Sequence, residues 1–311
     1  MPSRSAGSHD GPELHGLAGS ESNIAAEREA EPPPHHVNEE AVVNVRETSQ
    51  SLMQAVAEVA RAAGLMALTS HGRHLNVETK ADGSPVTIAD RAAEQHARAW
   101  IEKHFPGDGI LGEEFGITRP EAKRRWILDP IDGTKSFVRG VPLWGTLIAI
   151  AEGNDVLAGA AFFPAIDELV VAAQSCGCWW NGRACEVSKV GDLAAATVLA
   201  TDARFTERRS RRDAWNLLAS RATIARTWGD CYGYLLVATG RAEVMVDDIV
   251  SAWDAAAFLP IIEEAGGILT DWTGARTAFG GDVIATNGLL AGTVRDLLVR
   301  DVARAEHPTV S

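Results

Sequence analysis

The stretch "WILDPIDGTKSF" (126–137) carries two aspartates, Asp129 and Asp132, at the end of an apolar run. Pro130 disfavours a helical conformation at Asp129 and fixes its own φ angle, so we expect the chain to turn directly after a strand. Such a turn can aim both carboxylates at one point beside the backbone carbonyl of Ile131. A set of oxygen ligands of this kind suits Mg²⁺. The alternative is a polar turn with capping residues and no further role.

Gly133 and Thr134 follow the second aspartate and open a new segment. If a helix begins at this point, its free N–H groups and its dipole favour a phosphate group beside the metal. The stretch therefore predicts a metal site and a phosphate site next to each other.

Two further apolar segments bring acidic residues to their ends. "ILGEEFG" (110–116) leads into Glu113, and "SAWDAAAFLPIIEEAGG" (251–267) has Asp254 at the start of an apolar helix. The alternative for Glu113 is a solvated side chain with no further role. The alternative for Asp254 is a charge that complements the helix dipole. Convergence of carboxylates from separate elements is how a two-metal phosphoryl-transfer site is built.

Three stretches together resemble the signature blocks of the inositol monophosphatase family, which comprises Mg²⁺-dependent, lithium-sensitive phosphatases. They are "GEE" (112–114), "WILDPIDGTKSF" (126–137) and "WDAAAFLPIIEEAGG" (253–267), and their order and spacing also match. The resemblance extends from about residue 50 to about residue 300. It implies an α/β (α+β layered) fold, the αβαβα sandwich of the inositol monophosphatase and fructose-1,6-bisphosphatase type.

The resemblance also implies roles for individual residues and Mg²⁺ as the cofactor. The implied metal ligands are Glu113, Asp129, the carbonyl of Ile131, Asp132 and Asp254. The implied catalytic residues are Glu113, Thr134, which helps to activate the attacking water, and Asp90, which orients Thr134. Asp132 and the amides of Gly133 and Thr134 are implied to meet the phosphate. Asp90 and Thr87 come from "TKADGSPVTIAD" (79–90), which resembles an early Thr-x-x-Asp segment of the family.

The segment "ARTWGDCYGYLLVATGRAEVMVD" (225–247) bears on the substrate. Inositol phosphatases generally have Gly-Ser/Thr-Ala-Ala where this chain has "GDCY", and the segment resembles the histidinol-phosphatase branch instead. Asp230 and Asp247 can hold a cationic amine or imidazolium. Arg226 can reach the phosphate, and Trp228 can pack on a ring. The alternatives are that Arg226 is a charge at a sheet edge and that Trp228 belongs to the core.

We therefore predict a histidinol-phosphate phosphatase of histidine biosynthesis. An inositol-1-monophosphatase or a broad sugar-phosphate phosphatase is the first alternative. A catalytically silent binding or regulatory relative is an alternative of another class, although no metal carboxylate and no catalytic threonine is lost. The resemblance also suggests a homodimer.

Composition bounds the partners and the compartment. The 311 residues are 46% hydrophobic, and 42 acidic residues against 29 basic ones give a net charge of −13. This balance argues against nucleic acid or an anionic membrane as a partner. We recognise no stretch of the roughly 20 apolar residues that a membrane span needs. The four cysteines are interpreted as free thiols, which fits the cytoplasm.

The chain divides into a tail and a phosphatase domain. Residues 1–45 lack apolar periodicity and a signal-peptide core, so they are predicted to be a disordered extension, with the domain at 46–305. The spacing of apolar residues predicts one face of a helix at Leu52, Val56, Val59, Ala63 and Met66. A second helix is predicted to start near Thr87. Strands are predicted at 124–129, 145–153, 156–164, 168–173, 223–228 and 243–247, with helices at 230–240 and 253–266.

Overall fold

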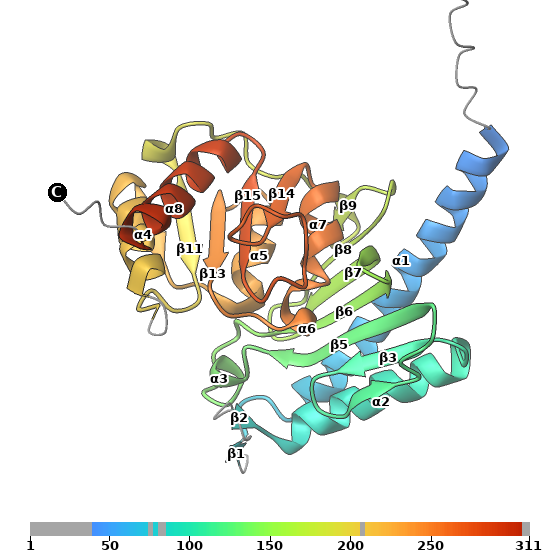
Figure 1. The fold of residues 1–311 in the computed structure, drawn as a ribbon. Helices are drawn as coiled ribbons and strands as arrows, with labels where there is room; N and C mark the ends of the chain where they lie inside the picture. The colour runs from blue at the N-terminus through green and yellow to red at the C-terminus, as the bar shows by residue number, and fades with distance from the viewer. Residues whose placement is uncertain (1–38, 74–76, 80–84, 206–208, 307–311) are drawn as a thin grey trace, which may run out of the picture. The chain divides into compact units, whose positions relative to one another are not determined.

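Helices and sheets alternate in five layers, in the order α-β-α-β-α (Figure 1). The computed structural model describes residues 39–73, 77–79, 85–205 and 209–306. Three clusters of buried hydrophobic side chains fill the spaces between the layers, so each sheet is covered on both faces. The predicted fold class is confirmed.

The first layer consists of α1 (Glu39–Leu68) and α2 (Ile88–His104), which pack on each other and on the larger sheet. The predicted apolar face of α1 is buried at Leu52, Val56, Val59 and Ala63. Met66 is 39% exposed, and Ala67 is buried instead. A step of four residues from Ala63 keeps Ala67 on the buried stripe, whereas a step of three turns Met66 away from it.

Helix α1 differs from the sequence expectations in two ways. It begins at Glu39, so its first turns lie inside the range predicted as a disordered extension, and residues 1–38 of that range lie outside the described residues. Residues Thr48–Leu68 are long and apolar enough, by length and composition alone, to cross a membrane, which we did not expect. Within the apolar window of this segment, 44% of the residues are buried in the protein.

The larger sheet has eight strands in the order β10-β9-β8-β7-β6-β5-β3-β4. All neighbours are antiparallel except the parallel pair β3 and β5, in agreement with the largely antiparallel first half that we expected. Its strands are β3 (Gly109–Gly112), β4 (Gly116–Thr118), β5 (Arg124–Asp132), β6 (Gly145–Glu152), β7 (Asp155–Phe163), β8 (Glu168–Ala173), β9 (Cys178–Trp180) and β10 (Arg183–Ala184).

The central layer contains α5 (Asp230–Ala238), α6 (Ala252–Ala255) and α7 (Phe258–Glu264). The sequence predicted one helix over 253–266, but the structure divides it between α6 and α7. Pro260 has no N–H for the carbonyl of Ala256, so a continuous helix would lose a hydrogen bond there. The backbone at the break packs closely against β7. A Cβ atom added to Gly159 of β7 would lie only 2.1 Å from the carbonyl oxygen of Ala257.

The smaller sheet has five strands in the order β12-β11-β13-β15-β14. The outer helices α4 (Arg209–Arg221) and α8 (Ala291–Glu306) cover its other face. The strands are β11 (Thr197–Ala200), β12 (Ile224–Arg226), β13 (Val244–Asp247), β14 (Gly267–Thr270) and β15 (Val283–Asn287). The predicted strands at 223–228 and 243–247 correspond to β12 and β13.

The remaining elements of the described residues are short. The short elements are β1 (Glu78–Thr79), β2 (Pro85–Val86), α3 (Thr134–Phe137) and the 3₁₀ helix η1 (Leu193–Ala195).

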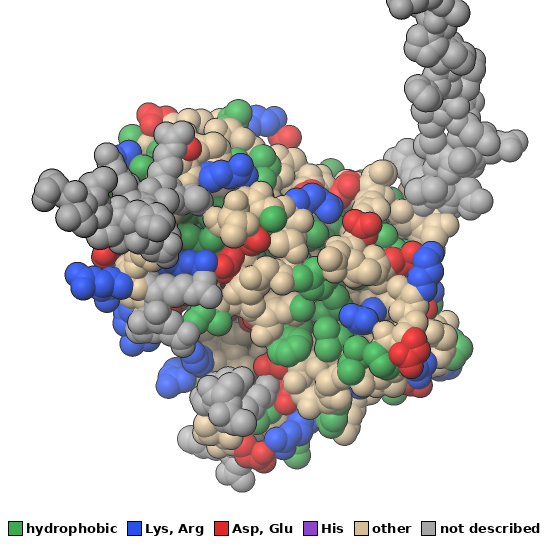
Figure 2. All heavy atoms as spheres, in the orientation of Figure 1, with side chains coloured by type: hydrophobic (Ala, Val, Ile, Leu, Met, Phe, Trp, Pro, Cys, Tyr) green, Lys and Arg blue, Asp and Glu red, His purple; other side chains and the backbone are tan. Residues whose placement is uncertain are grey.

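Figure 2 shows hydrophobic side chains gathered over the region where Figure 1 draws β3, β5 and α6. Phe115 and Ile117, next to and within β4, are among the large hydrophobic residues that are exposed.

Candidate metal centre and substrate pocket

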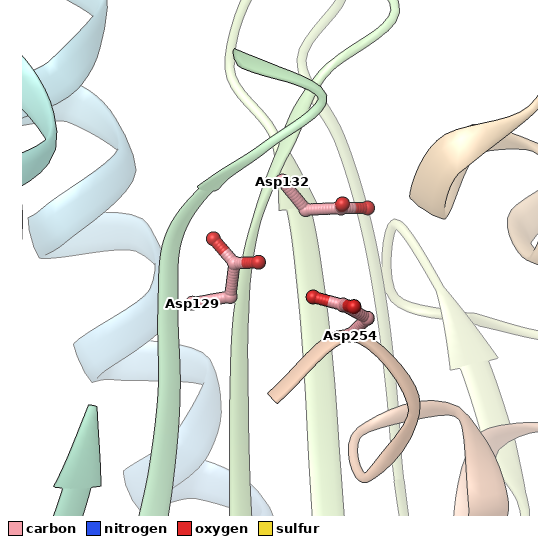
Figure 3. Close-up of side chains that lie close together, drawn as sticks. All are labelled: Asp129, Asp132 and Asp254. Carbon is pink, nitrogen blue, oxygen red and sulfur yellow. The ribbon is translucent and has the colours of Figure 1, made fainter. Parts of the chain in front are cut away.

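Three carboxylates converge where β5 meets α6. One oxygen each of Asp129, Asp132 and Asp254 lies within 4.8 Å of the others. Figure 3 shows the three side chains pointing toward one common space, two from β5 and one from α6. Three carboxylate oxygens at this spacing form a hard, anionic ligand set of the type that Mg²⁺ and Ca²⁺ prefer.

A β-bulge places the two aspartates of β5 on the same side of the sheet. Asp129 pairs with Leu147 and Asp132 with Gly145, so β5 takes three steps where β6 takes two. Without the extra residue, side chains three positions apart would point to opposite faces. The strand was predicted to end at Asp129, but this bulge lets it continue to Asp132. The hydroxyl of Thr146 donates to the carbonyl of Pro130 (2.8 Å) and fixes the bulge.

Asp254 is held by the first turn of its own helix. Ser251 is the N-cap of α6, and its backbone N–H donates to Oδ2 of Asp254 (2.7 Å) in a capping box. The alternative role of Asp254 at the start of its helix is therefore present, as a capping bond, and the same side chain also faces Asp129 and Asp132. Capping and metal ligation are compatible, because a carboxylate has two oxygens and several lone pairs.

The electrostatics of the cluster call for a cation. Burial raises the pKa of Asp129 well above its ordinary value, and the charges of Glu113, Asp132 and Asp254 raise it further. Burial also raises the pKa of Asp132, with Asp230 and Asp254 as additional causes. Like charges held this close in a buried site oppose one another unless a proton or a metal ion neutralises them. The residues present therefore fit a divalent cation.

Glu113 follows β3, and its backbone N–H donates to the carbonyl of Leu128 (3.2 Å). Glu94 of α2 holds the turn that carries it: its buried carboxylate accepts from the backbone N–H groups of Glu114 (2.7 Å) and Phe115 (3.2 Å). Arg98 pairs with Glu94 at 2.7 Å. The Glu94–Arg98 pair thus connects α2 to the turn beside the metal centre, a role that the sequence did not reveal.

Asp90 and Thr134 lie beside each other, as the resemblance implied. The hydroxyl of Thr134 donates to the carbonyl of Ile131 (3.0 Å) and is 3.5 Å from Oδ1 of Asp90. Thr87 caps α2 and donates through its N–H (2.8 Å) and its hydroxyl (2.6 Å) to Oδ2 of Asp90. Asp90 is buried and fixed in orientation by these bonds, so its other oxygen faces Thr134.

Gly133 is the N-cap of α3 and adopts a left-handed conformation with φ of 86°. A Cβ at this position would lie 3.1 Å from the carbonyl of Leu143 and 3.3 Å from a carboxylate oxygen of Asp230. Both the backbone angle and the close approach favour glycine. The short helix α3 therefore begins directly after Asp132.

A pocket begins at the metal centre and continues along an acidic wall. It is lined by four carboxylates and by hydroxyl and apolar groups, namely Asp132, Thr201, Asp230, Tyr234, Asp247, Ile249, Val250 and Asp254. Asp247 accepts from the hydroxyl of Tyr234 (2.8 Å) and from the backbone N–H of Thr201 (3.0 Å). Burial raises the pKa of Asp247 to about 7, and these bonds only partly oppose the shift.

Asp230 connects α5 to the same pocket. Burial raises its pKa, Lys135 opposes that shift, and Asp254 reinforces it. The next residue, Cys231, donates its backbone N–H to Oδ2 of Asp132 (2.5 Å). The start of α5 is therefore bound to the metal centre, which places the predicted specificity residue Asp230 beside it.

Arg226 and Trp228 are not among the residues that line this pocket. Arg226 ends the edge strand β12, is exposed, and donates to the carbonyl of Ala225 (2.8 Å). Trp228 is 44% exposed and so does not belong to the core. The structure brings Asp230 and Asp247 into the pocket, while substrate contacts by Arg226 and Trp228 remain predictions.

Sequence reasoning missed Thr201, Tyr234, Glu94 and Lys135. Tyr234 lies one helical turn after Asp230, and this spacing on a buried helix was an available signal. Thr201 follows β11, and its place next to Asp247 depends on the pairing of β11 with β13. Pairing between distant strands cannot be read from local sequence.

Comparison with known proteins identifies the family to which the chain belongs. Residues 48–307 match the inositol monophosphatase family. The chain belongs to this family. A histidinol-phosphatase of Chlorobaculum parvum is 43% identical over 76% of the chain and 93% of that relative. A histidinol-phosphatase of Mycobacterium tuberculosis is 38% identical over 77% of the chain and 94% of that relative. A solved structure of an inositol monophosphatase from Zymomonas mobilis has a TM-score of 0.72 and is 31% identical, covering 80% of this chain and 98% of that one.

The family prediction is thus confirmed, and its signature blocks fall on the site. The inositol monophosphatase blocks at 126–137 and 253–267 supply the aspartates that meet in Figure 3. The block at 112–114 supplies Glu113, whose charge acts on Asp129. Elements far apart in the sequence therefore build one centre.

Proposed function

We propose that this protein is a Mg²⁺-dependent phosphatase that hydrolyses L-histidinol phosphate to L-histidinol and phosphate. The observation that carries the proposal is the pocket in which Asp230 and Asp247 continue the acidic wall of the metal centre. Such a pocket suits a substrate with an anionic phosphate at one end and a cation at the other. Histidinol phosphate has this pattern, because its leaving group carries an ammonium and an imidazole.

The metal would be held by Asp129, Asp132 and Asp254, with Glu113 and the carbonyl of Ile131 as further ligands. When bound, it supplies the positive charge that neutralises the phosphate and activates water. Unaided, phosphate monoesters hydrolyse extremely slowly. A protein with a net charge of −13 needs such a local positive charge to bind an anionic substrate at all.

Thr134 and Asp90 would position the attacking water. The hydroxyl of Thr134 lies between the carbonyl of Ile131 and the carboxylate of Asp90. A hydroxyl that donates to one of these acceptors keeps its own lone pairs for a proton of the water. Glu113, on the neighbouring turn, is the candidate to receive the other proton of the water, which Thr134 does not hold.

The amides of Gly133 and Thr134 would bind the phosphate oxygens. They lie at the start of α3, directly after Asp132, where backbone N–H groups favour an anion. Lys135 is close enough to lower the pKa of Asp230, so it adds positive charge to this side of the site.

Asp230 and Asp247 would select the leaving group. Both are buried enough for their pKa values to be raised, so a cation that pairs with them relieves an unfavourable burial. Inositol 1-phosphate has only neutral hydroxyl groups in its leaving group and leaves these carboxylates without a cation. A buried polar group without its partner is costly, so such a site discriminates strongly.

Similarity to relatives supports the same choice. The histidinol-phosphatases of Chlorobaculum parvum and Mycobacterium tuberculosis are more similar to this chain than the inositol monophosphatase of Zymomonas mobilis is. Histidine biosynthesis would then be the pathway, and the cytoplasm the compartment. No disulfide joins any of the four cysteines, all of which lie within the described residues, and this fits a reducing compartment.

The experiment is a panel of phosphate esters, measured as phosphate release with Mg²⁺ and with excess chelator. The panel comprises histidinol phosphate, inositol 1-phosphate, fructose 1,6-bisphosphate and adenosine 3′,5′-bisphosphate. We expect the highest kcat/KM for histidinol phosphate and no turnover with chelator. Full activity with chelator would refute the metal mechanism. A tenfold higher kcat/KM for another ester would refute histidinol phosphate as the preferred substrate but would leave the proposed phosphatase activity intact.

A further inference from the structure

Two cysteines face each other across the hairpin of β9 and β10. Trp180 pairs with Arg183 and Trp179 with Ala184, so the next pair toward the open end is Cys178 and Cys185. The backbone N–H of Cys185 donates to the carbonyl of Cys178 (3.0 Å), which confirms the register. Directly opposite residues of antiparallel strands have Cα atoms about 4.5–5.5 Å apart, inside the range that a disulfide spans.

The sulfur atoms are already close but not bonded. The Sγ atoms of Cys178 and Cys185 lie 3.3 Å apart, and both residues are free thiols. A disulfide needs this distance to fall to about 2.0 Å, which side-chain rotation in a hairpin can supply without a change of register. The third cysteine nearby, Cys176, precedes the strand and belongs to the turn before it.

The surroundings make Cys185 the more reactive thiol. Cys185 is half-buried, whereas Cys178 is 2% exposed. The hydrogen bond between the two thiols lowers the pKa of Cys185, partial burial opposes this shift, and the charge of Arg241 adds to it. The same hydrogen bond, together with burial, raises the pKa of Cys178. A thiol of lowered pKa with access to solvent is the one that attacks an external disulfide.

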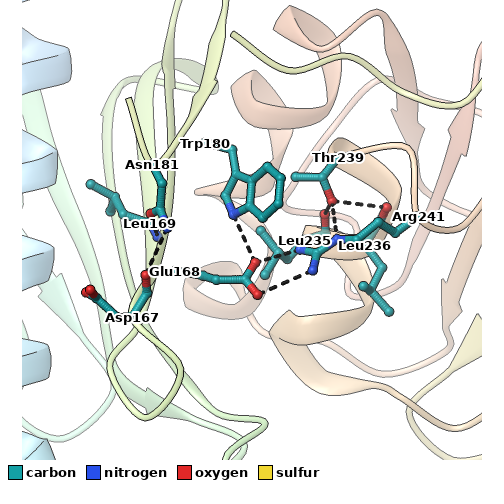
Figure 4. Close-up of polar contacts among 9 residues, drawn as sticks. All are labelled: Asp167, Glu168, Leu169, Trp180, Asn181, Leu235, Leu236, Thr239 and Arg241. Carbon is teal, nitrogen blue, oxygen red and sulfur yellow. Dashed lines mark hydrogen bonds and ion pairs between the residues drawn. The ribbon is translucent and has the colours of Figure 1, made fainter. Parts of the chain in front are cut away.

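A network of polar contacts holds Arg241 next to the hairpin (Figure 4). Arg241 follows α5, pairs with Glu168 of β8 (2.6 Å), and its guanidinium lies 4.7 Å from the ring centre of Trp180. The indole N–H of Trp180 donates to the same carboxylate (2.9 Å). On the other side, Glu264 of α7 accepts from the N–H groups of Ser175 (2.8 Å) and Gly177 (2.7 Å). The hairpin that carries both thiols is therefore fixed at both ends.

We propose that Cys178 and Cys185 are a reversible thiol–disulfide site whose reagent is a low-molecular-weight disulfide such as oxidised glutathione. The Cys185 thiolate attacks one sulfur of the reagent, forms a mixed disulfide and releases one glutathione thiolate. That thiolate takes the proton of Cys178. The Cys178 sulfur then attacks Sγ of Cys185 and releases the second glutathione. The two protein thiols lose two electrons, and one glutathione disulfide is reduced to two thiols.

The test incubates the full chain in glutathione buffers of increasing oxidation, blocks free thiols, and analyses tryptic peptides by mass. Cleavage after Arg183 separates the two cysteines, so a disulfide joins peptide 140–183 to peptide 184–189. The first peptide also contains Cys176, and Cys176→Ser is the matched control. We expect the joined peptides in the wild type and in Cys176→Ser, and their loss after reduction.

Three results would overturn the proposal: no joined peptides at any buffer, a Cys185–glutathione adduct that does not proceed further, or loss of the joined peptides in Cys176→Ser. Cys185→Ala must abolish the cross-link. A variant of the buried Cys178 can fail to fold. The Cys176→Ser control therefore shows, without a Cys178 variant, whether Cys178 or Cys176 is the partner of Cys185. The oxidised wild type should also melt at a higher temperature than the reduced form, since the cross-link restricts the unfolded chain, whereas Cys185→Ala should melt alike in both buffers.

Discussion

Asp132 illustrates how one residue serves two opposed requirements. Its carboxylate accepts a short hydrogen bond from the N–H of Cys231, which favours the charged form, yet burial and the charges of Asp230 and Asp254 raise its pKa well above the ordinary value. Because folding raises this pKa, the buried carboxyl lowers the stability of the metal-free protein at neutral pH. In the proposed metal-bound form the ionised carboxylate would hold the cation, so a group that lowers stability would serve function.

Asp132→Asn should therefore separate activity from stability. We expect kcat to fall by several orders of magnitude, because the metal loses a charged ligand, while the melting temperature of the metal-free protein stays equal or rises. Asp213→Asn, on the exposed side of α4, is the matched control and should change neither quantity. Wild-type turnover in Asp132→Asn would show that the metal assignment is wrong.

Asp247 predicts a pH dependence of cation binding. Its pKa is raised to about 7, so the ionised fraction grows from about one tenth at pH 6 to about nine tenths at pH 8. L-histidinol should bind the metal-free protein up to roughly tenfold more tightly across this range through Asp247 alone. The imidazole of the ligand titrates in the same range, so the informative quantity is the difference between wild type and Asp247→Asn in calorimetry. An identical pH profile in the variant would exclude Asp247 as the cation partner.

At the scale of elements, the sequence predicted those parts of the fold that depend on local pattern. The apolar face of α1, the cap at Thr87 and strands β5 to β8 follow from periodicity and turn residues. The bulge between Asp129 and Asp132 does not, because it depends on the register with β6. Likewise, Asp230 could be selected as a departure from a family pattern, but Thr201 could not, since it reaches the pocket only through the pairing of β11 with β13.

The turn after β3 shows how an element supports the metal centre from outside. Glu94 is fully buried and binds two backbone N–H groups of that turn and Arg98. Glu94→Gln leaves Arg98 without its charged partner, and we expect a loss of about 3 kcal/mol in the free energy of unfolding. Glu113 should then be held less firmly, with a roughly tenfold loss of Mg²⁺ affinity by calorimetry.

The control for this variant is Glu78→Gln. Glu78 pairs with Arg91 of the same helix α2, but both side chains are exposed, so the pair contributes little. No change in melting temperature or Mg²⁺ affinity is expected from it. If Glu94→Gln also bound Mg²⁺ like the wild type, Glu94 would only stabilise the fold and would not position Glu113.

At the scale of the whole molecule, the described layers contain all the residues proposed for function, and α1 begins at Glu39. A chain that starts at Glu39 should therefore keep the melting temperature and the kcat of the full-length protein, because no proposed contact precedes that residue. Differential scanning calorimetry and phosphate release check both quantities. A marked loss of either would assign a structural or functional role to residues 1–38.

Assembly is a second property of the whole molecule. We expect the homodimer predicted from the family resemblance to form through the exposed apolar surface seen in Figure 2, since monomeric proteins seldom expose large apolar patches. Light scattering should give twice the chain mass of 33.1 kDa. A single chain mass at micromolar concentration would contradict this prediction and leave the site unaffected.

The central claim is that an acidic wall beside the metal centre selects a cationic leaving group. The most direct measurement is the ratio of kcat/KM for histidinol phosphate to kcat/KM for p-nitrophenyl phosphate, compared between the wild type and Asp230→Ala. The account predicts that this ratio falls at least tenfold in the variant, because turnover of the generic ester, which carries no cation, is largely kept. An unchanged ratio, or an equal loss for both esters, would contradict it.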